Sequence, residues 1–175
     1  MNSISRLFLA LCLVLASGCA KSLVVSDTAG GPIARGVPVY VAVAEDGRHE
    51  DKVHEGSGLL ASVAVAESLE PYTTDRIIGL AKETQDEALA SARRTNSAYL
   101  VYPRIVRWVD RAAISAKPEA AEVHVSVVEA ATGRTVNTAQ LVGQGQIVLR
   151  PSTPSEQLVA PLNEWAAKAF AAQAE

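Results

Sequence analysis

The sequence predicts a single α/β domain: a mixed sheet of about five strands in the order βαβαβββα, with three helices packed on it. Three observations lead to this class. Valine-rich runs typical of strands alternate with segments whose apolar residues recur at helical spacing. Two strand–helix crossovers come first, and consecutive strands follow them. Because a strand–helix–strand crossover joins parallel strands, the first part of the sheet should be parallel.

The first half of the domain supplies both crossovers. Residues 39–44 (VYVAVA) form a strand covered on both faces, and residues 76–81 form a second short strand, central if buried. Between them, residues 57–70 form a helix that stops before Pro71. Its apolar positions at helical spacing are Leu59, Leu60, Val63, Ala66 and Leu69. Residues 84–96 form the next helix, which opens with a capping box between Thr84 and Glu87.

The second half begins with three consecutive strands. Residues 99–110 form a long strand in which Pro103 cannot donate to a ladder, and this indicates an edge or a bulge. Residues 122–129 alternate cleanly, which buries three valines and turns His124 and Ser126 away from them. Gly133 allows a positive φ in the following turn, and residues 136–148 return as the last strand.

The last helix begins at a second capping box, between Thr153 and Glu156, with Pro154 at the first helical position. One apolar stripe follows, made of Leu158, Leu162, Trp165, Ala169 and Phe170. Pro161 lies inside this stripe and should kink the helix or delay its start.

The amino terminus has the order of a secretory signal. A short polar segment ends in Arg6, and residues 7–16 (LFLALCLVLA) form an apolar run followed by small residues. The run has about ten residues, whereas a membrane-spanning helix needs about 20. We therefore expect residues 1–18 to be a signal peptide that is removed.

The next residue, Cys19, follows Ala16-Ser17-Gly18 in a pattern that resembles a bacterial lipobox. In such a box the cysteine thiol is acylated, and several fatty chains hold the protein on a membrane. We expect Cys19 to be the lipid attachment site. The alternative is an ordinary signal peptide cut next to a free cysteine.

The residue after the cysteine bears on which membrane holds the protein. Ala20 is not the aspartate that retains lipoproteins at the inner membrane of enteric bacteria, so the outer membrane is expected. Lys21 and Ser22 resemble the pair that favours inner-membrane retention in pseudomonad-like hosts, and they leave this choice open.

Residues 19–38 are rich in glycine, proline and polar residues, and we expect a lipidated amino terminus followed by a flexible tether. Such a tether would span about 25 Å as a coil and about 60 Å when extended. Residues 39–175 then form the globular α/β domain, a natural size for one core.

Composition excludes several functions. The formal net charge is −3, without the basic patch that nucleic acid requires. Cys12 leaves with the signal peptide, so the mature chain has no disulfide and no thiolate metal site. No G-x-S-x-G motif is present for a serine hydrolase.

The segment Gly56-Ser57-Gly58-Leu59-Leu60-Ala61 matches the G-x-G-x-x-A pattern of a dinucleotide-binding turn. A nucleotide site needs the first glycine directly after the strand, so that the helix amino terminus faces the pyrophosphate. Here the strand ends about a dozen residues earlier. We instead expect Ser57 to cap the helix and the glycines to let the loop turn into it.

The loop Glu45 to Glu55 gathers seven possible metal ligands: Glu45, Asp46, His49, Glu50, Asp51, His54 and Glu55. Their spacing matches no zinc template and no i, i+4 histidine pair on a helix. We interpret the segment as a solvated charged loop, and we keep metal or ligand binding there as the alternative.

One aromatic and basic cluster lies on the strand 99–110 and just beyond it. Regular alternation places Tyr102, Arg104 and Trp108 on one face, with Arg107 and Arg111 on the other. The cluster is interpreted either as core packing with a charged strand end or as an edge that binds a partner, because these residue types dominate interface energies.

The chain resembles a proteobacterial lipoprotein family, domain of unknown function 4823. The residues that carry the resemblance are VYVAVAEDG, HEGSG, ALASARRTNSAYLVYPRIVRWVDRA and VVEAATGRTV, between Val39 and Phe170. His54 stands where an aromatic residue is expected. The element order is also similar to periplasmic domains of the penicillin-binding-protein activator lipoproteins, the curli secretion lipoprotein and the amino-terminal domain of the Tol translocation protein. These relatives bind other envelope proteins.

The sequence as a whole predicts a cell-envelope lipoprotein that faces the periplasm, bound to the membrane through its lipid and to a possible envelope protein partner. We expect a non-catalytic partner-binding or scaffolding module, without cofactor, metal or nucleic acid. The alternative is a small envelope enzyme or a metal- or ligand-binding protein that uses the loop Glu45 to Glu55.

Overall fold

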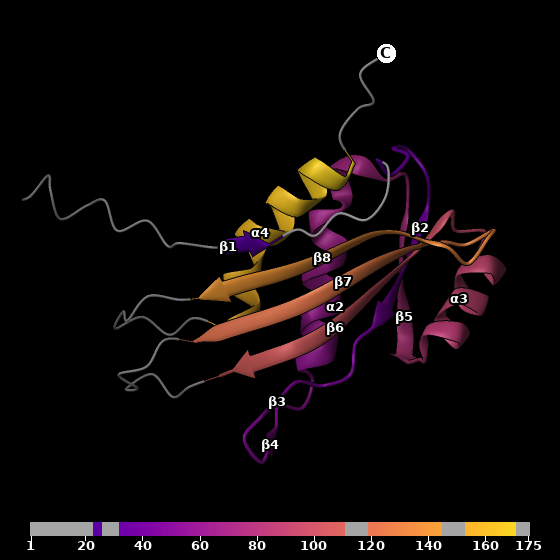
Figure 1. Ribbon diagram of the computed structural model, residues 1–175. Coiled ribbons are helices and arrows are strands. Elements are labelled where there is room, and N and C mark those ends of the chain that lie inside the picture. The colour runs from indigo at the N-terminus through magenta and orange to yellow at the C-terminus, as the bar shows by residue number, and fades with distance from the viewer. Residues whose placement is uncertain (1–22, 26–31, 111–118, 145–152, 171–175) are drawn as a thin grey trace, which may run out of the picture.

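The computed structural model describes residues 23–25, 32–110, 119–144 and 153–170 (Figure 1). The strands are β1 (Leu23–Val25), β2 (Val39–Val43), β3 (Arg48–His49), β4 (Lys52–Val53), β5 (Arg76–Lys82), β6 (Tyr99–Val109), β7 (Ala120–Glu129) and β8 (Thr135–Gln144). The helices are α2 (Ser57–Ser68), α3 (Gln85–Arg94) and α4 (Pro154–Ala169), and a short 3-10 turn, η1, covers Glu70–Tyr72.

The main sheet is mixed, as predicted. Its strand order is β1-β8-β7-β6-β2-β5. Strand β2 pairs in parallel with both β5 and β6, and the other neighbours are antiparallel. The predicted α/β class, with three helices on one mixed sheet, is therefore confirmed. Strand β5 lies at an edge of this sheet, whereas the sequence placed it in the centre if buried; its residues become exposed towards Lys82.

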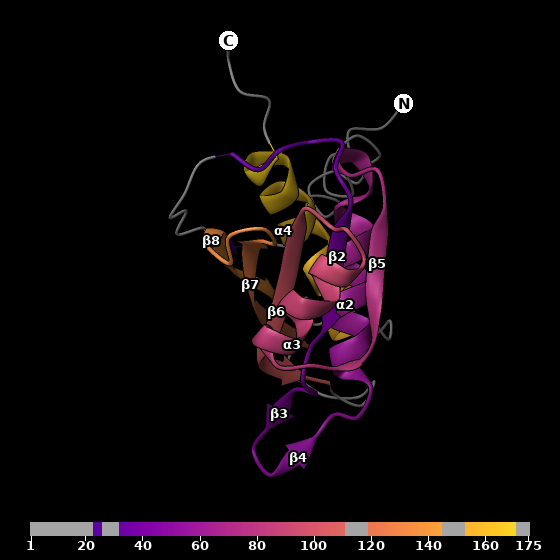
Figure 2. The same cartoon turned by 90° about the vertical axis from the view of Figure 1, so that its right-hand side faces the viewer.

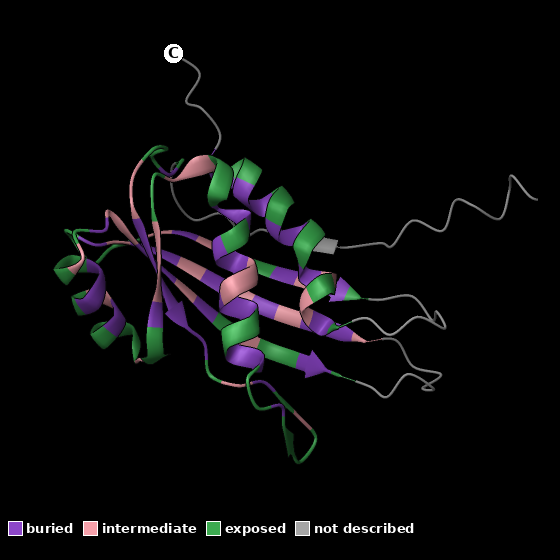
Figure 3. Ribbon diagram, turned by 180° about the vertical axis from the view of Figure 1, so that it is seen from behind, coloured by how far each residue is buried: buried purple, intermediate pink, exposed green. Residues whose placement is uncertain are grey.

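The helices lie on both faces of the sheet. Helices α2 and α4 pack side by side over one face, as Figure 3 shows from behind. Helix α3 packs on the other face, against β2 and β6, at one end of the sheet (Figure 2). The core under α2 and α4 holds both tryptophans, and within it the indole N–H of Trp165 donates to Asn137 Oδ1 at 3.0 Å. None of the helices in the described ranges is long and apolar enough to span a bilayer.

Both predicted capping boxes are present. Thr84 accepts a hydrogen bond from the backbone of Glu87, whose carboxylate accepts in return, and Thr153 and Glu156 repeat the arrangement. Gly133 has the predicted positive φ, at 74°. Helix α4 runs from Pro154 through Pro161 to Ala169, so Pro161 does not delay its start.

The apolar positions predicted for α2 are only partly confirmed: Ala66 and Leu69 are buried and Val63 is half-buried. Leu59 and Leu60 are 50% and 51% exposed, and the helix instead buries small residues against the sheet. The buried residues are Ser57, Gly58, Ala61, Ser62, Val65, Ala66 and Ser68. The reason is the close approach of the helix: a Cβ at Gly58 would lie 2.0 Å from the carbonyl oxygen of Ala44. Small side chains suit this distance, and the leucines face outward.

The segment predicted as a tether contacts the domain in two places. Strand β1 pairs antiparallel with β8, with Leu23 opposite Val142. Ile33 is 3% exposed, and its backbone N–H donates to the carbonyl of Ala169 at 2.9 Å. The tether prediction did not include these contacts, because a three-residue apolar run among glycines has no clear strand signal.

The contact between β8 and α4 provides a test of packing. A Cβ at Gly143 would lie 2.1 Å from the carbonyl oxygen of Gln157, a backbone atom that cannot rotate away. We expect Gly143→Ala to lower the free energy of unfolding by about 1–3 kcal/mol, measured by urea denaturation. Gln144→Ala, at the exposed neighbour, should change it by less than about 0.5 kcal/mol. Equal effects of the two substitutions would show that the approach of α4 is looser than described.

Candidate functional site

The loop Glu45 to Glu55 is a small hairpin. Strands β3 and β4 pair antiparallel, with His49 opposite Lys52. The backbone N–H of His54 donates to the carbonyl of Gly47 at 2.9 Å and closes the base of the hairpin. A Cβ at Gly47 would lie 2.5 Å from the Cβ of Trp108, so the hairpin base rests directly on β6.

Asp46 holds the hairpin to the body of the domain. Its Oδ1 accepts from the backbone N–H of Gly58 at 2.9 Å, and its Oδ2 accepts from Lys82 Nζ at 2.8 Å. The lysine, more than any other group, keeps the pKa of Asp46 below its usual value. A carboxylate beside the first N–H groups of a helix is also favoured by the helix dipole. Asp46 thus joins β5, α2 and the hairpin.

The start of α2 differs from the prediction at Ser57. The N-cap residue is Gly56, with φ of 81°, and no side chain caps it directly. The Ser57 hydroxyl instead accepts from the backbone N–H of Gly47 at 2.8 Å. The prediction that Ser57 caps the helix is therefore wrong, because its hydroxyl is used to fasten the hairpin.

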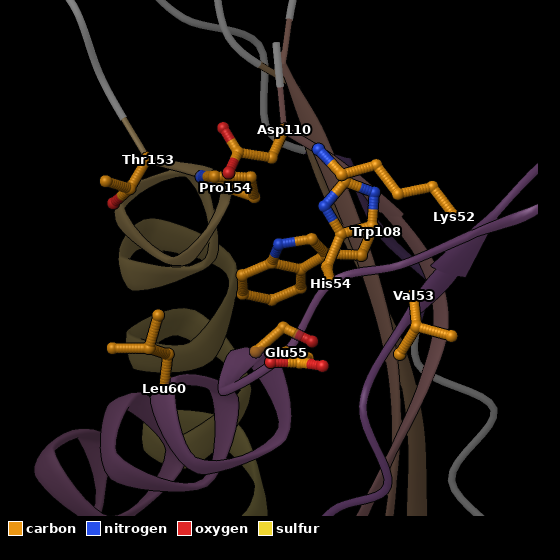
Figure 4. Close-up of a pocket in the computed structure, with 10 residues that line it drawn as sticks. Lys52, Val53, His54, Glu55, Leu60, Trp108, Asp110, Thr153 and Pro154 are labelled. Atoms are coloured by element: carbon orange, nitrogen blue, oxygen red, sulfur yellow. The ribbon is translucent and has the colours of Figure 1, made fainter.

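A cavity of about 350 Å³ lies between the hairpin, the first turns of α2 and α4, and the end of β6 (Figure 4). Its lining mixes four apolar residues with six polar or charged ones, and its volume lies within the range of small-ligand pockets. The lining residues are Lys52, Val53, His54, Glu55, Ser57, Leu60, Trp108, Asp110, Thr153 and Pro154.

His54 is the central polar group of this cavity. It is 8% exposed, its ring lies beside the Trp108 indole, and its side chain has no hydrogen bond within the described part of the chain (Figure 4). Burial, followed by the nearby charge of Lys52, lowers the pKa of His54, while Asp110 opposes this effect. The imidazole is therefore neutral near pH 7 and can accept or donate a hydrogen bond to a small ligand.

Lys52 and Glu55 line the cavity together with His54, but the other polar residues of the hairpin do not reach it. Glu50 and Asp51 lie exposed at the hairpin tip, and His49 is near Glu50, with 3.8 Å between Nε2 and Oε1. Among the residues that the structure describes, no three His, Cys, Asp or Glu side chains are grouped so that they could hold a metal ion.

The aromatic and basic cluster of β6 is divided by a bulge. The register with β7 shifts between Ile105 and Arg107, which makes Val106 an extra residue. The predicted common face of Tyr102 and Trp108 is therefore wrong: Trp108 packs in the core under α2 and α4, and Tyr102 packs on the α3 side. Trp108 is 2% exposed, as core packing requires. Arg111 lies outside the described residues.

The bulge also explains Pro103. Strand β6 pairs with β2 only from Tyr99 to Val101, so Pro103 lies beyond the end of that ladder and two residues before the register shift. Of the two predicted alternatives, the bulge is present close to Pro103. The strand is not at an edge, because β6 lies between β7 and β2.

Sequence reasoning missed a polar cluster around Glu83. The Tyr40 hydroxyl donates to Glu83 Oε2 and the Ser91 hydroxyl to Oε1, each at 2.5 Å. Burial and the Glu83 carboxylate raise the pKa of Tyr40. The residue in the sequence that reflects this cluster is Gly79, a glycine inside a strand. A Cβ at this position would lie 2.8 Å from the Tyr40 hydroxyl oxygen. The cluster fastens α3 to β2 and to the end of β5, a structural role.

Cys19, the predicted lipid attachment site, lies outside the described residues. Acylation of this residue stays a prediction.

Comparison with solved structures identifies the fold. PelC from Paraburkholderia phytofirmans, described as a dodecamer, is similar with a TM-score of 0.67 and 19% identity over 87% of this chain and 100% of that chain. A point variant of PelC, also a dodecamer, gives 0.68 and 20% over the same shares. The lipoprotein GNA1162 from Neisseria meningitidis gives 0.50 and 13%, over 75% of this chain and 99% of that chain.

Comparison of the sequence gives one family. Residues 32–169 match DUF4823, a domain of unknown function. No curated protein matches the chain.

The lowered pKa of His54 predicts how stability depends on pH. Because the folded state holds this histidine below its ordinary pKa of 6.5, the unfolded state binds the proton more readily, and stability is lost as pH falls below about 6.5. His124 is shifted in the same direction. We expect the free energy of unfolding to fall between pH 7 and pH 5, and His54→Gln to make this fall shallower. Urea denaturation across this range measures it; identical slopes in the two proteins would contradict the burial of a neutral imidazole.

Proposed function

The chain belongs to the DUF4823 family, and we propose that it is a non-catalytic lipoprotein of the cell envelope that works by binding other protein chains. The observation that carries the proposal is an apolar surface beside an open sheet edge. Cys19 would anchor the domain to a membrane, facing the periplasm, and the missing aspartate at Ala20 favours the outer membrane.

The α2–β5 surface consists of Leu59 and Val63 of α2 with Ile78 and Leu80 of β5. Leu80 is fully exposed, at 104%, and Leu59 is half exposed. A depression lined partly by Val63 and Ile78 lies between the two elements. Large apolar side chains grouped on a surface are typical of protein contact sites.

The edge of β5 adds backbone groups to this surface. Strand β5 pairs with β2 on one side only, and its other side has no strand partner in the described part of the chain. An open edge offers a row of unpaired N–H and C=O groups to another chain. Apolar side chains next to such an edge favour a partner that pairs with β5 and covers α2 together.

The partner that we place first is a second copy of this chain. The support is the fold shared with PelC, which is described as a dodecamer. A different envelope protein is the second choice. The cavity beside His54 favours one further candidate function, binding of a small ligand at the hairpin.

Charge placed on the α2–β5 surface tests the proposal. We expect Leu59→Glu and Leu80→Glu to weaken self-association of the full-length protein at least about tenfold, because a buried unpaired carboxylate would lie in the contact. Mass photometry of protein extracted in mild detergent, together with crosslinking in intact membranes, measures the change.

Two variants serve as controls for that experiment. Val106→Glu introduces the same charge at a residue of similar exposure, 54%, on β6 and should leave self-association unchanged. His54→Gln should also leave it unchanged, because the cavity lies apart from β5. A wild-type protein that is monomeric and crosslinks to no other protein would refute the proposal.

The anchor is tested separately. We expect Cys19→Ser to release the protein from the membrane fraction, because the substitution removes the thiol that would carry the fatty chains. Fractionation and mass spectrometry of the amino terminus measure the outcome. An unmodified thiol in the wild-type protein, with membrane association unchanged, would contradict the role of Cys19.

A further inference from the structure

Part of the sheet face that carries α3 is left uncovered. Helix α3 packs over Leu100 and Val128, at one end of β6 and β7. The remaining length of β6, β7 and β8 faces the viewer in Figure 1 with no helix of the described chain over it. The residues here are polar, so this face differs from the apolar α2–β5 surface.

A cavity of about 410 Å³ lies on this face, beside the start of α3. It is lined by Gln85, Tyr102, Arg104, His124 and Ser126, and each of these side chains contains at least one hydrogen-bond donor. None of the lining residues is acidic. Three nearby carboxylates have other partners: Glu122 accepts from Gln140 Nε2, Glu87 caps α3 with Thr84, and Glu45 lies 3.8 Å from Lys82 Nζ.

Arg104 and His124 lie directly opposite each other on neighbouring antiparallel strands. Arg104 is exposed and has no ion pair within the described residues. The Nδ1 atom of His124 is buried and has no hydrogen-bond partner among the residues that the structure describes. Burial, and then the charge of Arg104, lowers the pKa of His124, so the ring is neutral near pH 7. A buried N–H donor without a partner is rarer in folded proteins than a buried acceptor without one. We therefore place the ring proton of His124 on Nε2 and leave Nδ1 as the acceptor.

We propose that this Arg104–His124 site binds an oxyanion group, a carboxylate or a phosphate. The guanidinium offers two parallel N–H donors that match such a group, and the imidazole Nε2–H, the Ser126 hydroxyl and the Gln85 amide can supply further donors. A bound oxyanion would also neutralise the free charge of Arg104 beside the histidine. The inference is independent of the α2–β5 surface.

The chain contains three histidines, and this makes the site directly observable. Full-length protein labelled only in its histidine rings gives three sets of ring signals by NMR in detergent. We expect inorganic phosphate or acetate, added at constant ionic strength against chloride, to shift the His124 signals in a saturable way. His49 and His54 should not follow the same curve. The anion that saturates at the lower concentration identifies the preferred oxyanion, phosphate or carboxylate.

The variants test the role of the guanidinium. Arg104→Gln should weaken anion binding at least about tenfold, the usual effect of losing one charge-assisted hydrogen-bonded pair. Arg134→Gln removes the same charge from the exposed turn after β7 and should have no effect. The inference is overturned if His124 shows no saturable shift with either anion, or if Arg104→Gln binds as well as the wild type. Both arginines are exposed, so neither variant should disturb folding.

Discussion

The arrangement of this molecule depends on how closely α2 approaches the end of β2. The carbonyl of Ala44 occupies the space where Gly58 has no side chain, and the backbone N–H of Ala44 donates to the Ser62 hydroxyl at 3.0 Å. Asp46, two residues later, accepts from the N–H of Gly58. These three contacts thus fix the first two turns of the helix against the end of the strand. Any larger residue at Gly58 would displace the helix, the hairpin and the wall of the His54 cavity together.

The same approach decides which residues face the solvent. Where α2 lies closest to the strand it buries the small residues Gly58, Ala61 and Ser62, and Val65 is buried one turn further along the helix. Its two leucines lie outside this contact and are half exposed. Leu59 can therefore contribute to the α2–β5 surface, which has an open edge because β5 is the outermost strand of the sheet.

The three helices and the five longer strands could be predicted from the sequence, because their signals are local, whereas β1 and the β3–β4 hairpin were not predicted. The capping boxes at Thr84 and Thr153 and the positive φ of Gly133 depend on neighbouring residues alone. The faces of α2 and β6 could not be predicted. Periodicity gives the spacing of apolar residues but not the distance between a helix and its sheet, and an extra residue such as Val106 reverses the alternation without a sequence signal. The sequence could single out His54 as a candidate site residue. Its burial beside Trp108 could not be predicted, because it depends on how the hairpin packs on β6.

The sheet order also shows where the α2–β5 surface lies relative to the predicted membrane anchor at Cys19. Leu23 begins β1 only four residues after Cys19, and four residues of extended chain reach at most about 14 Å. If Cys19 carries lipid, the β1–β8 edge must therefore lie close to the membrane, nearer than a free tether through residue 38 would require. Strand β5 is the opposite edge of the six-stranded sheet, five strand spacings or about 24 Å away. The edge that carries the apolar surface is thus the one farthest along the sheet from the anchored strand, where the membrane does not restrict the approach of a second protein chain.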